Sequence, residues 1–141
     1  MAEPLPLSRR VLAVFDDAAS ADRGAAAARR GGATVVERLE GERAANLIDA
    51  SGGRRGALAR LGRAVQFSVE DQMPALAWYE AALREGRVVL AVPTTRRDQT
   101  LAVVRALSTA GGHFINRFGR LDTEEFARWR GPEPAISDLL K

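Results

Sequence analysis

Two continuous apolar runs divide the chain into two similar halves. The first covers residues 10–16 (RVLAVFD) and the second covers residues 87–93 (RVVLAVP). Uninterrupted apolar runs of this length, rich in β-branched residues, predict strands that are buried on both faces. We therefore expect the two runs to lie at the centre of one sheet, adjacent and parallel to each other.

The first half continues as a helix and a second strand. Residues 18–30 (AASADRGAAAARR) are alanine-rich, which favours a helix, with Asp17 or Ser20 as its cap and a glycine pair after its end. Residues 33–39 (ATVVERL) are β-branched at first and polar later. This pattern predicts a strand near a sheet edge.

The second half begins with a predicted helix. Ser68 with Asp71 forms a variant of the capping box, and the helix extends to Gly86. Pro74 falls about a turn inside, so a later start is an alternative. Thr95 with Asp98 repeats the capping signal for the helix after the second apolar run. The predicted buried stripe of that later helix consists of Leu101, Val104 and Leu107.

The end of the chain completes the pattern. Residues 113–118 (HFINRF) alternate between polar and apolar types, which predicts a half-exposed strand. Thr123, followed by Glu125 and Phe126, begins a predicted short terminal helix.

These elements predict an α+β fold, a ferredoxin-like βαβ plait with two βαβ halves and a helical insertion between them. The fully apolar strands suit the centre of such a sheet and the more polar strands suit its edges. With 141 residues, the chain fits a flexible arm (1–8), one α+β domain (9–130) and a tail (131–141). The insertion, residues 41–66, contains a short helix at 41–50 and a glycine-interrupted helix at 54–66.

A plait of this kind places its helices on one face of the sheet. The other face then needs a cover, and alternate residues of the strands make it apolar. Its candidates are Ile115 and one alternate set of Val88, Leu90 and Val92. We expect a symmetric homodimer to bury this face, with an internal lid formed by residues 41–66 as the alternative.

Charge and composition exclude several classes of function. The chain has 21 basic residues, all but one arginine, yet its net charge is only +3, so nucleic acid is a disfavoured partner. Without cysteine, disulfides, thiolate metal sites and cysteine nucleophiles are excluded. Apolar runs are too short for a membrane span and the N-terminus lacks a signal-peptide core, so we expect a cytoplasmic protein without a membrane partner. The arginine, alanine and glycine bias suggests a GC-rich bacterial genome.

The candidate ligand-binding residues lie in the segment GGHFINRFGR, residues 111–120: His113, Asn116, Arg117 and Arg120. Histidine is a common acid or base near neutral pH, and arginine binds anions through its forked donors. Strand periodicity places His113 and Arg117 on one face, which predicts a site for a small anion. Alternatively, the two phenylalanines of this strand pack in the core and a backbone group caps His113. We expect His113→Ala to change stability by less than about 1 kcal/mol.

Other motifs favour structural roles. Asp16 and Asp17 are only two carboxylates, better explained as strand terminator and helix cap than as a metal site. No phosphate-binding loop and no serine-hydrolase elbow is present. Trp78 with Tyr79 favours core packing over a stacking platform. The glycine-interrupted helix contains a cluster of four arginines: Arg54, Arg55, Arg60 and Arg63. We interpret the cluster as a solvated helix face, and binding to an acidic surface or to nucleic acid is the alternative. We therefore expect no catalytic residue, no metal and no cofactor.

Two long segments resemble a known family. VLAVFDDAASADRGAAAARRGGA has a strand, an acidic turn and an alanine-rich helix. AWYEAALREGRVVLAVPTTRRDQTLAVVRALSTAGGHFINRFGRL has a tyrosine-glutamate helix, an apolar strand and a closing helix with a glycine-histidine turn. Both are similar to small bacterial general stress proteins (heat-induced stress protein domains). The middle differs, with RRGALARLGR where the family often has a glycine-rich segment. The resemblance implies a stress-associated protein with no established active site.

Three functions remain open from the sequence. The first is a non-enzymatic, stress-associated domain that acts through self-association or partner binding. The second is a regulatory plait that binds a small anion on the face with His113 and Arg117. The third is an enzyme with His113 as acid or base, disfavoured because no nucleophile or metal set accompanies this histidine.

Overall fold

A computed structural model of the chain describes residues 7–52, 66–119, 122–134 and 136. Its sheet contains β1 (Arg10–Phe15), β2 (Glu37–Glu40), β3 (Val88–Pro93), β4 (His113–Phe118) and β5 (Thr123–Ala127). The strand order is β2-β3-β1-β4-β5, and every strand is antiparallel to its neighbours. The helices in the described residues are α1 (Ala18–Arg30), α2 (Gly41–Gly52), α4 (Gln66–Arg84) and α5 (Arg97–Thr109).

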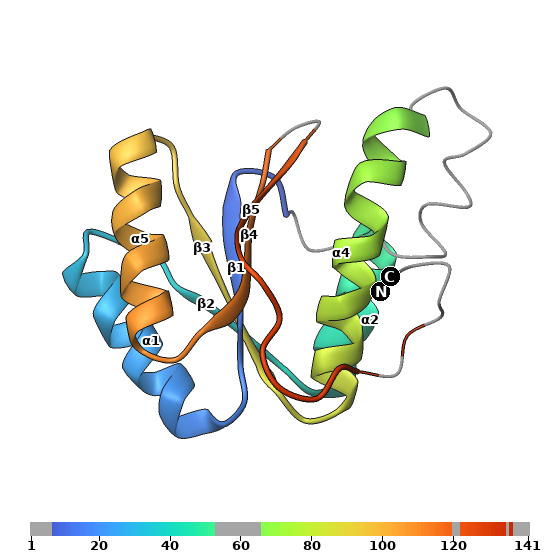
Figure 1. Cartoon of the computed structure of the whole chain (residues 1–141), viewed down its shortest axis with the longest axis horizontal. Coiled ribbons are helices and arrows are strands. Elements are labelled where there is room, and N and C mark those ends of the chain that lie inside the picture. Colours follow the sequence, from blue (N-terminus) through green and yellow to red (C-terminus); the bar gives the residue numbers. More distant parts are fainter. Residues whose placement is uncertain (1–6, 53–65, 120–121, 135, 137–141) are drawn as a thin grey trace.

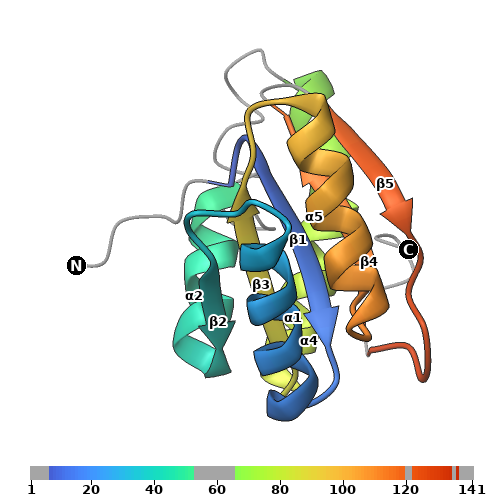
Figure 2. The ribbon, with the colours of Figure 1, turned by 90° about the vertical axis from the view of Figure 1, so that its left-hand side faces the viewer.

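The sheet lies between two layers of helices. Helices α1 and α5 cover one face, while α2 and α4 cover the other (Figure 1). Viewed from the α1 and α5 side, the strands follow one another from β2 to β5 behind these two helices (Figure 2). Units β1-α1-β2 and β3-α5-β4 interleave, so the α+β class and the plait-like layout predicted from the sequence are confirmed.

Strands β1 and β3 are adjacent and central, as predicted, but they are not parallel. Phe15 pairs with Val88 and Val11 pairs with Val92, which is an antiparallel register. The reason lies in the insertion, because α2 and α4 pack against each other and return the chain to the end of the sheet that β2 reached. Glu40, the last residue of β2, therefore pairs with Val88, the first residue of β3. Strand β3 must then run back along the sheet.

Alternation along the central strands divides the core into two apolar clusters. In β1, Leu12 and Val14 pack beneath α2 and α4, while Val11, Ala13 and Phe15 pack beneath α1 and α5. All five side chains are fully buried. Both faces of the sheet are therefore covered by the chain itself.

The uncovered apolar face expected from the sequence is not found in the described structure. Its candidate residues Ile115, Val88, Leu90 and Val92 all lie in the cluster beneath α1 and α5. The opposite face is closed by α2 and α4, the first of which belongs to the insertion that was the alternative lid. The described sheet therefore offers no uncovered apolar face that a symmetric homodimer would bury.

Several helix boundaries follow the sequence and others do not. Asp17 caps α1 as predicted, because its Oδ1 accepts a hydrogen bond of 2.7 Å from the backbone N–H of Ser20. Helix α2 confirms the short helix predicted from residue 41. Helix α4 begins at Gln66, so Ser68 lies within its first turn and is not its N-cap. The second predicted helix of the insertion, with its four arginines, lies almost entirely outside the described residues.

Helix α5 differs from its prediction in both cap and buried face. Arg96 is its N-cap residue and makes no side-chain cap, while Gln99 Oε1 accepts a 3.0 Å hydrogen bond from the backbone N–H of Thr95. Leu101 is 43% exposed, and Leu107 alone of the predicted stripe is buried. The buried set is Thr100, Val103 and Leu107, the face that the helix turns toward the sheet.

The segment after β4 is a strand and not the predicted terminal helix. The backbone N–H of Gly119 donates to the carbonyl of Asp122 at 2.8 Å, which turns the chain so that β5 pairs with β4. Glutamate favours helices, but pairing with a neighbouring strand overrides that weak preference. Because β5 covers its outer edge, β4 is an interior strand and is mostly buried, contrary to the half-exposed strand expected.

Candidate functional site

Among the residues predicted to bind a ligand, the three that the structure describes, His113, Asn116 and Arg117, have different partners. His113 begins β4 near Val14 of β1, whereas Arg117 lies further along the strand, opposite Val11. The Arg117 guanidinium donates from Nε to Oγ1 of Thr94 at 3.0 Å and from Nη2 to the Thr94 carbonyl at 2.9 Å. It therefore anchors the loop between β3 and α5. Arg120 lies outside the described residues.

His113 is held by two hydrogen bonds, one on each ring nitrogen. Its Nδ1 accepts from the backbone N–H of Arg130 at 3.1 Å, and its Nε2 lies 2.8 Å from Oδ1 of Asp16. A backbone N–H can only donate, so Nδ1 carries no proton and the Nε2–H donates to the carboxylate. The side chain is only 1% exposed. Neither nitrogen is available to a substrate or a metal ion, which favours the structural alternative for this histidine.

Aromatic and basic side chains enclose the imidazole. The Trp129 ring meets the His113 ring edge to face at a centroid distance of 4.9 Å. The Arg87 guanidinium lies 5.2 Å from the centroid of Trp129 and donates from Nε to Asp16 at 3.3 Å. Arg130 donates from Nη2 to the carbonyl of Gly112 at 2.9 Å. These contacts hold the segment after β5 against the start of β4.

Asn116 belongs to a second buried network centred on Tyr79. The amide of Asn116 donates to the Tyr79 hydroxyl at 3.0 Å. The single hydroxyl proton can go to the carbonyl of Phe114 at 2.6 Å or of Leu12 at 3.0 Å. Burial raises the pKa of Tyr79, so it remains protonated. The network holds an irregular part of β4, where Phe114 has a φ of 47°.

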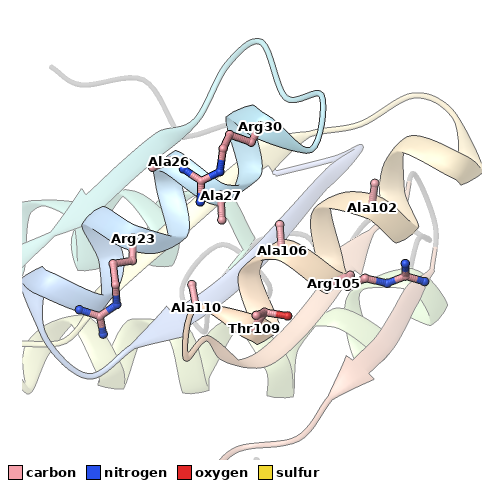
Figure 3. A pocket seen from close by; sticks show the side chains of 9 residues that line it. All are labelled: Arg23, Ala26, Ala27, Arg30, Ala102, Arg105, Ala106, Thr109 and Ala110. Carbon is pink, nitrogen blue, oxygen red and sulfur yellow. The ribbon is translucent and has the colours of Figure 1, made fainter.

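A groove that the sequence analysis missed lies between α1 and α5 on the outer surface. It has a volume of about 570 Å³. Figure 3 shows the alanine side chains of the two helices with arginines around them. The residues that line the groove are Arg23, Ala26, Ala27, Arg30, Ala102, Arg105, Ala106, Thr109 and Ala110.

The groove exists because the facing side chains are too short to fill the seam. On α1 the lining residues Arg23, Ala27 and Arg30 recur at helical spacing, and on α5 Ala102 and Ala106 do the same. This repeat of alanine and arginine was visible in the sequence. Neither residue type is by itself a sign of a site, so the repeat does not predict a groove.

Three arginines line the groove beside its alanine floor. None of the lining residues is acidic. Within the described part of the chain, Arg30 and Arg105 form no side-chain hydrogen bond or ion pair, whereas other arginines, such as Arg10 and Arg84, pair with carboxylates. A carboxylate supplied by another molecule therefore meets guanidinium groups that have no competing partner.

The chemistry of the groove suits binding and not catalysis. Its only side-chain hydroxyl is that of Thr109, and no histidine, acid or thiol lines it. No group of three histidine, aspartate or glutamate side chains that could hold a metal ion occurs in the described residues. The groove offers methyl groups for apolar contact and guanidinium groups for anions.

Comparisons of the chain with known proteins found no related protein. No protein-family model matches the chain, and no curated protein or solved structure is significantly similar to it. Among the described helices, none has both the length and the apolar character needed to cross a membrane.

Proposed function

We propose that this chain is a non-enzymatic binding domain whose groove between α1 and α5 takes an anionic partner protein. The observation that carries the proposal is that Arg23, Arg30 and Arg105 line a groove with an alanine floor and no acidic residue in its lining. Guanidinium groups bind carboxylates through two parallel hydrogen bonds. The methyl groups of the floor add apolar contact area.

The groove favours a protein over other anionic partners. A small inorganic ion would meet the arginines but leave the alanine floor in contact with water. Proteins that bind single-stranded nucleic acid commonly stack its bases on aromatic side chains, and no aromatic residue lines this groove. A second copy of the chain placed groove to groove would bring arginines against arginines, which disfavours symmetric self-association through this face.

Two alternatives from the sequence have less support. An enzyme that uses His113 needs a free ring nitrogen, and both nitrogens are engaged. An anion site shared by His113 and Arg117 needs the two side chains together, and they bind different segments. We include in the proposal a cytoplasmic, stress-associated role, which the resemblance to general stress proteins supports.

Binding of acidic and basic peptides tests this proposal. A fluorescent glutamate-rich peptide is titrated with the protein at low ionic strength, and its anisotropy is compared with that of a lysine-rich peptide of equal length. We expect only the acidic peptide to bind, more weakly as salt rises, because exposed charges are screened. The double variant Arg30→Glu/Arg105→Glu should weaken binding by about tenfold or more, which corresponds to 1.4 kcal/mol.

The matched control is Arg29→Glu/Arg43→Glu. It makes the same change in net charge with exposed arginines that do not line the groove. Equal weakening by the control pair would show that only the overall charge matters, and the proposal would fail.

A further inference from the structure

We infer that the partner presents an acidic amphipathic α-helix to this groove. The inference rests on the proposed function, because it names the structural element that occupies the same site. It follows from the shape of the floor, the spacing of the arginines and the chemistry of the lining.

The floor has the shape that a third helix needs. Two neighbouring helices form its walls. The floor between them consists of alanines: Ala26 and Ala27 on α1, Ala102 and Ala106 on α5, and Ala110 at the C-cap of α5. Helices pack by fitting the ridges of one into the grooves of another, and small residues allow their axes to approach closely. An apolar helix face can therefore contact the floor along its length. Grooves of this kind bind helices through anchor residues three and four positions apart.

The arginines match carboxylates on such a helix. Arg23 and Arg30 are seven residues apart on α1, which is about 10 Å along the helix axis. Acidic residues seven positions apart on a partner helix have the same spacing. Arg105 lies on α5, so it belongs to the opposite wall. The matching partner helix thus has small apolar residues in one stripe and carboxylates along both sides of it.

A flexible acidic chain fits the groove less well. It can meet the arginines in any conformation, but it has no continuous apolar face for the alanine floor. Helical structure in the bound partner is therefore the property that separates this inference from the general proposal.

Paired peptides test the helix directly. One peptide of about 14 residues has alanine and leucine at helical spacing, with glutamate on both sides of that stripe. A scrambled peptide has the same composition without the stripe. We expect the amphipathic peptide to bind about tenfold more tightly or better in fluorescence anisotropy, and to gain helical circular dichroism when bound.

A variant that fills the floor gives an independent test. Ala106→Leu places a larger side chain in the groove and leaves all three arginines in place. It should weaken the binding of the amphipathic peptide by about tenfold or more. The affinity for an oligoglutamate probe should change by less than about twofold. Ser108→Leu, at an exposed position of α5 outside the groove, is the matched control and should change neither. Thermal unfolding of both variants checks that they are folded.

The outcomes separate the inference from the proposal. If the amphipathic and scrambled peptides bind equally and Arg30→Glu/Arg105→Glu weakens the binding of both, the inference of a helical partner is wrong. The proposal that the groove binds an anionic protein is then kept. If neither peptide binds, or if the arginine variants bind as the unchanged protein does, both ideas are wrong. Tighter, arginine-dependent binding of a single-stranded oligonucleotide would overturn the choice of a protein partner.

Discussion

At the scale of single residues, the side chain of His113 joins the start of β4 to two other segments, the one after β1 and the one after β5. Its ring contacts Asp16 after β1 and the backbone of Arg130 after β5, and it packs against Trp129. These contacts are all structural. The same residue type in a cleft with one free nitrogen would have supported catalysis.

His113→Ala should lower the free energy of unfolding by about 2–3 kcal/mol, because it removes a buried ring and two hydrogen bonds. This replaces the value below 1 kcal/mol expected from the sequence, which is typical of a residue outside buried hydrogen-bond networks. Urea unfolding followed by circular dichroism measures the change. Ser108→Ala, at an exposed position, is the control and should be nearly neutral. A loss below 1 kcal/mol for His113→Ala would show that its hydrogen bonds contribute little.

Tyr79→Phe should also destabilise the protein, by about 2 kcal/mol, because the buried amide of Asn116 then loses its acceptor. The double variant Tyr79→Phe/Asn116→Leu removes both partners. It should lose less stability than the sum of the single variants, and a double-mutant cycle in urea measures this coupling. Additive losses would mean that the two side chains do not support each other.

The candidate site shows what sequence can predict at the residue scale. Residue types identified His113 and Arg117 as side chains that could bind an anion. They did not identify the groups to which these side chains are hydrogen-bonded. Asp16 is 97 positions from His113, so only the fold brings them together. The groove could not be predicted from residue types, because alanines and arginines on a helix usually form an ordinary solvated face.

At the scale of elements, α1 lies close to β1 because Gly24 has no side chain. A Cβ at this position would lie 2.7 Å from Cε1 of Phe15. Gly24→Ala should therefore lower stability by about 1–2 kcal/mol, although alanine is the better helix former. Thermal unfolding measures the loss, and Phe15→Leu in the same chain should recover part of it.

Gly31→Ala, at the end of the same helix, is the control. Its Cβ would have ordinary contacts of 3.5 Å, and its φ of −81° suits alanine. We expect no loss of stability there. Similar losses at Gly24 and Gly31 would refute the steric explanation.

The cap of α1 makes stability depend on pH. The hydrogen bond from the backbone N–H of Ser20 lowers the pKa of the Asp17 carboxyl below its ordinary value. The carboxylate therefore stabilises the fold above that ordinary value, and the contribution is lost as pH falls through the lowered pKa. Asp17→Asn keeps an acceptor that does not titrate.

Urea unfolding at pH 7 and pH 3 should show a smaller loss on acidification for Asp17→Asn than for the unchanged protein. Asp17→Ala, which has no acceptor, should be less stable than Asp17→Asn at both pH values. An identical loss in the unchanged protein and Asp17→Asn would mean that the cap does not contribute to acid unfolding.

Elements were predictable where the local sequence and the packing agree. The alanines of α1 and the apolar runs of β1 and β3 specify their structures locally. Residues 123–127 do not, because their glutamates favour a helix and only pairing with β4 makes them a strand. The buried side of α5 depends in the same way on where the helix meets the sheet.

At the scale of the molecule, the chain covers both faces of its own sheet. Among residues 7–48, 75–119, 122–134 and 136, the only large hydrophobic residues that are exposed are Val35 and Leu101, at 51% and 43%. They give no continuous apolar patch that needs a second copy. We expect a monomer near the chain mass of 15.2 kDa in light scattering at micromolar concentration. A mass twice as large would show an interface other than the sheet face.

The class of fold was predictable from the two apolar runs and the helices that follow them. The direction of β3 was not predictable from the sequence, because it depends on how many times the insertion crosses the molecule. Residues 41–66 contain glycines and arginines that leave this number open. The helix pair α2 and α4 decides both the strand direction and the closure of the second face.

The strand order also has a consequence for synthesis. Strands β1 and β2 do not touch, because β3 lies between them, so the sheet has no hydrogen-bonded pair until β3 leaves the ribosome. About 70 residues separate β1 from β3, which is roughly 4–15 s of translation. During that interval the most apolar segment made so far has no partner strand. Chaperones that bind exposed apolar segments of nascent chains therefore have their longest opportunity at residues 10–15.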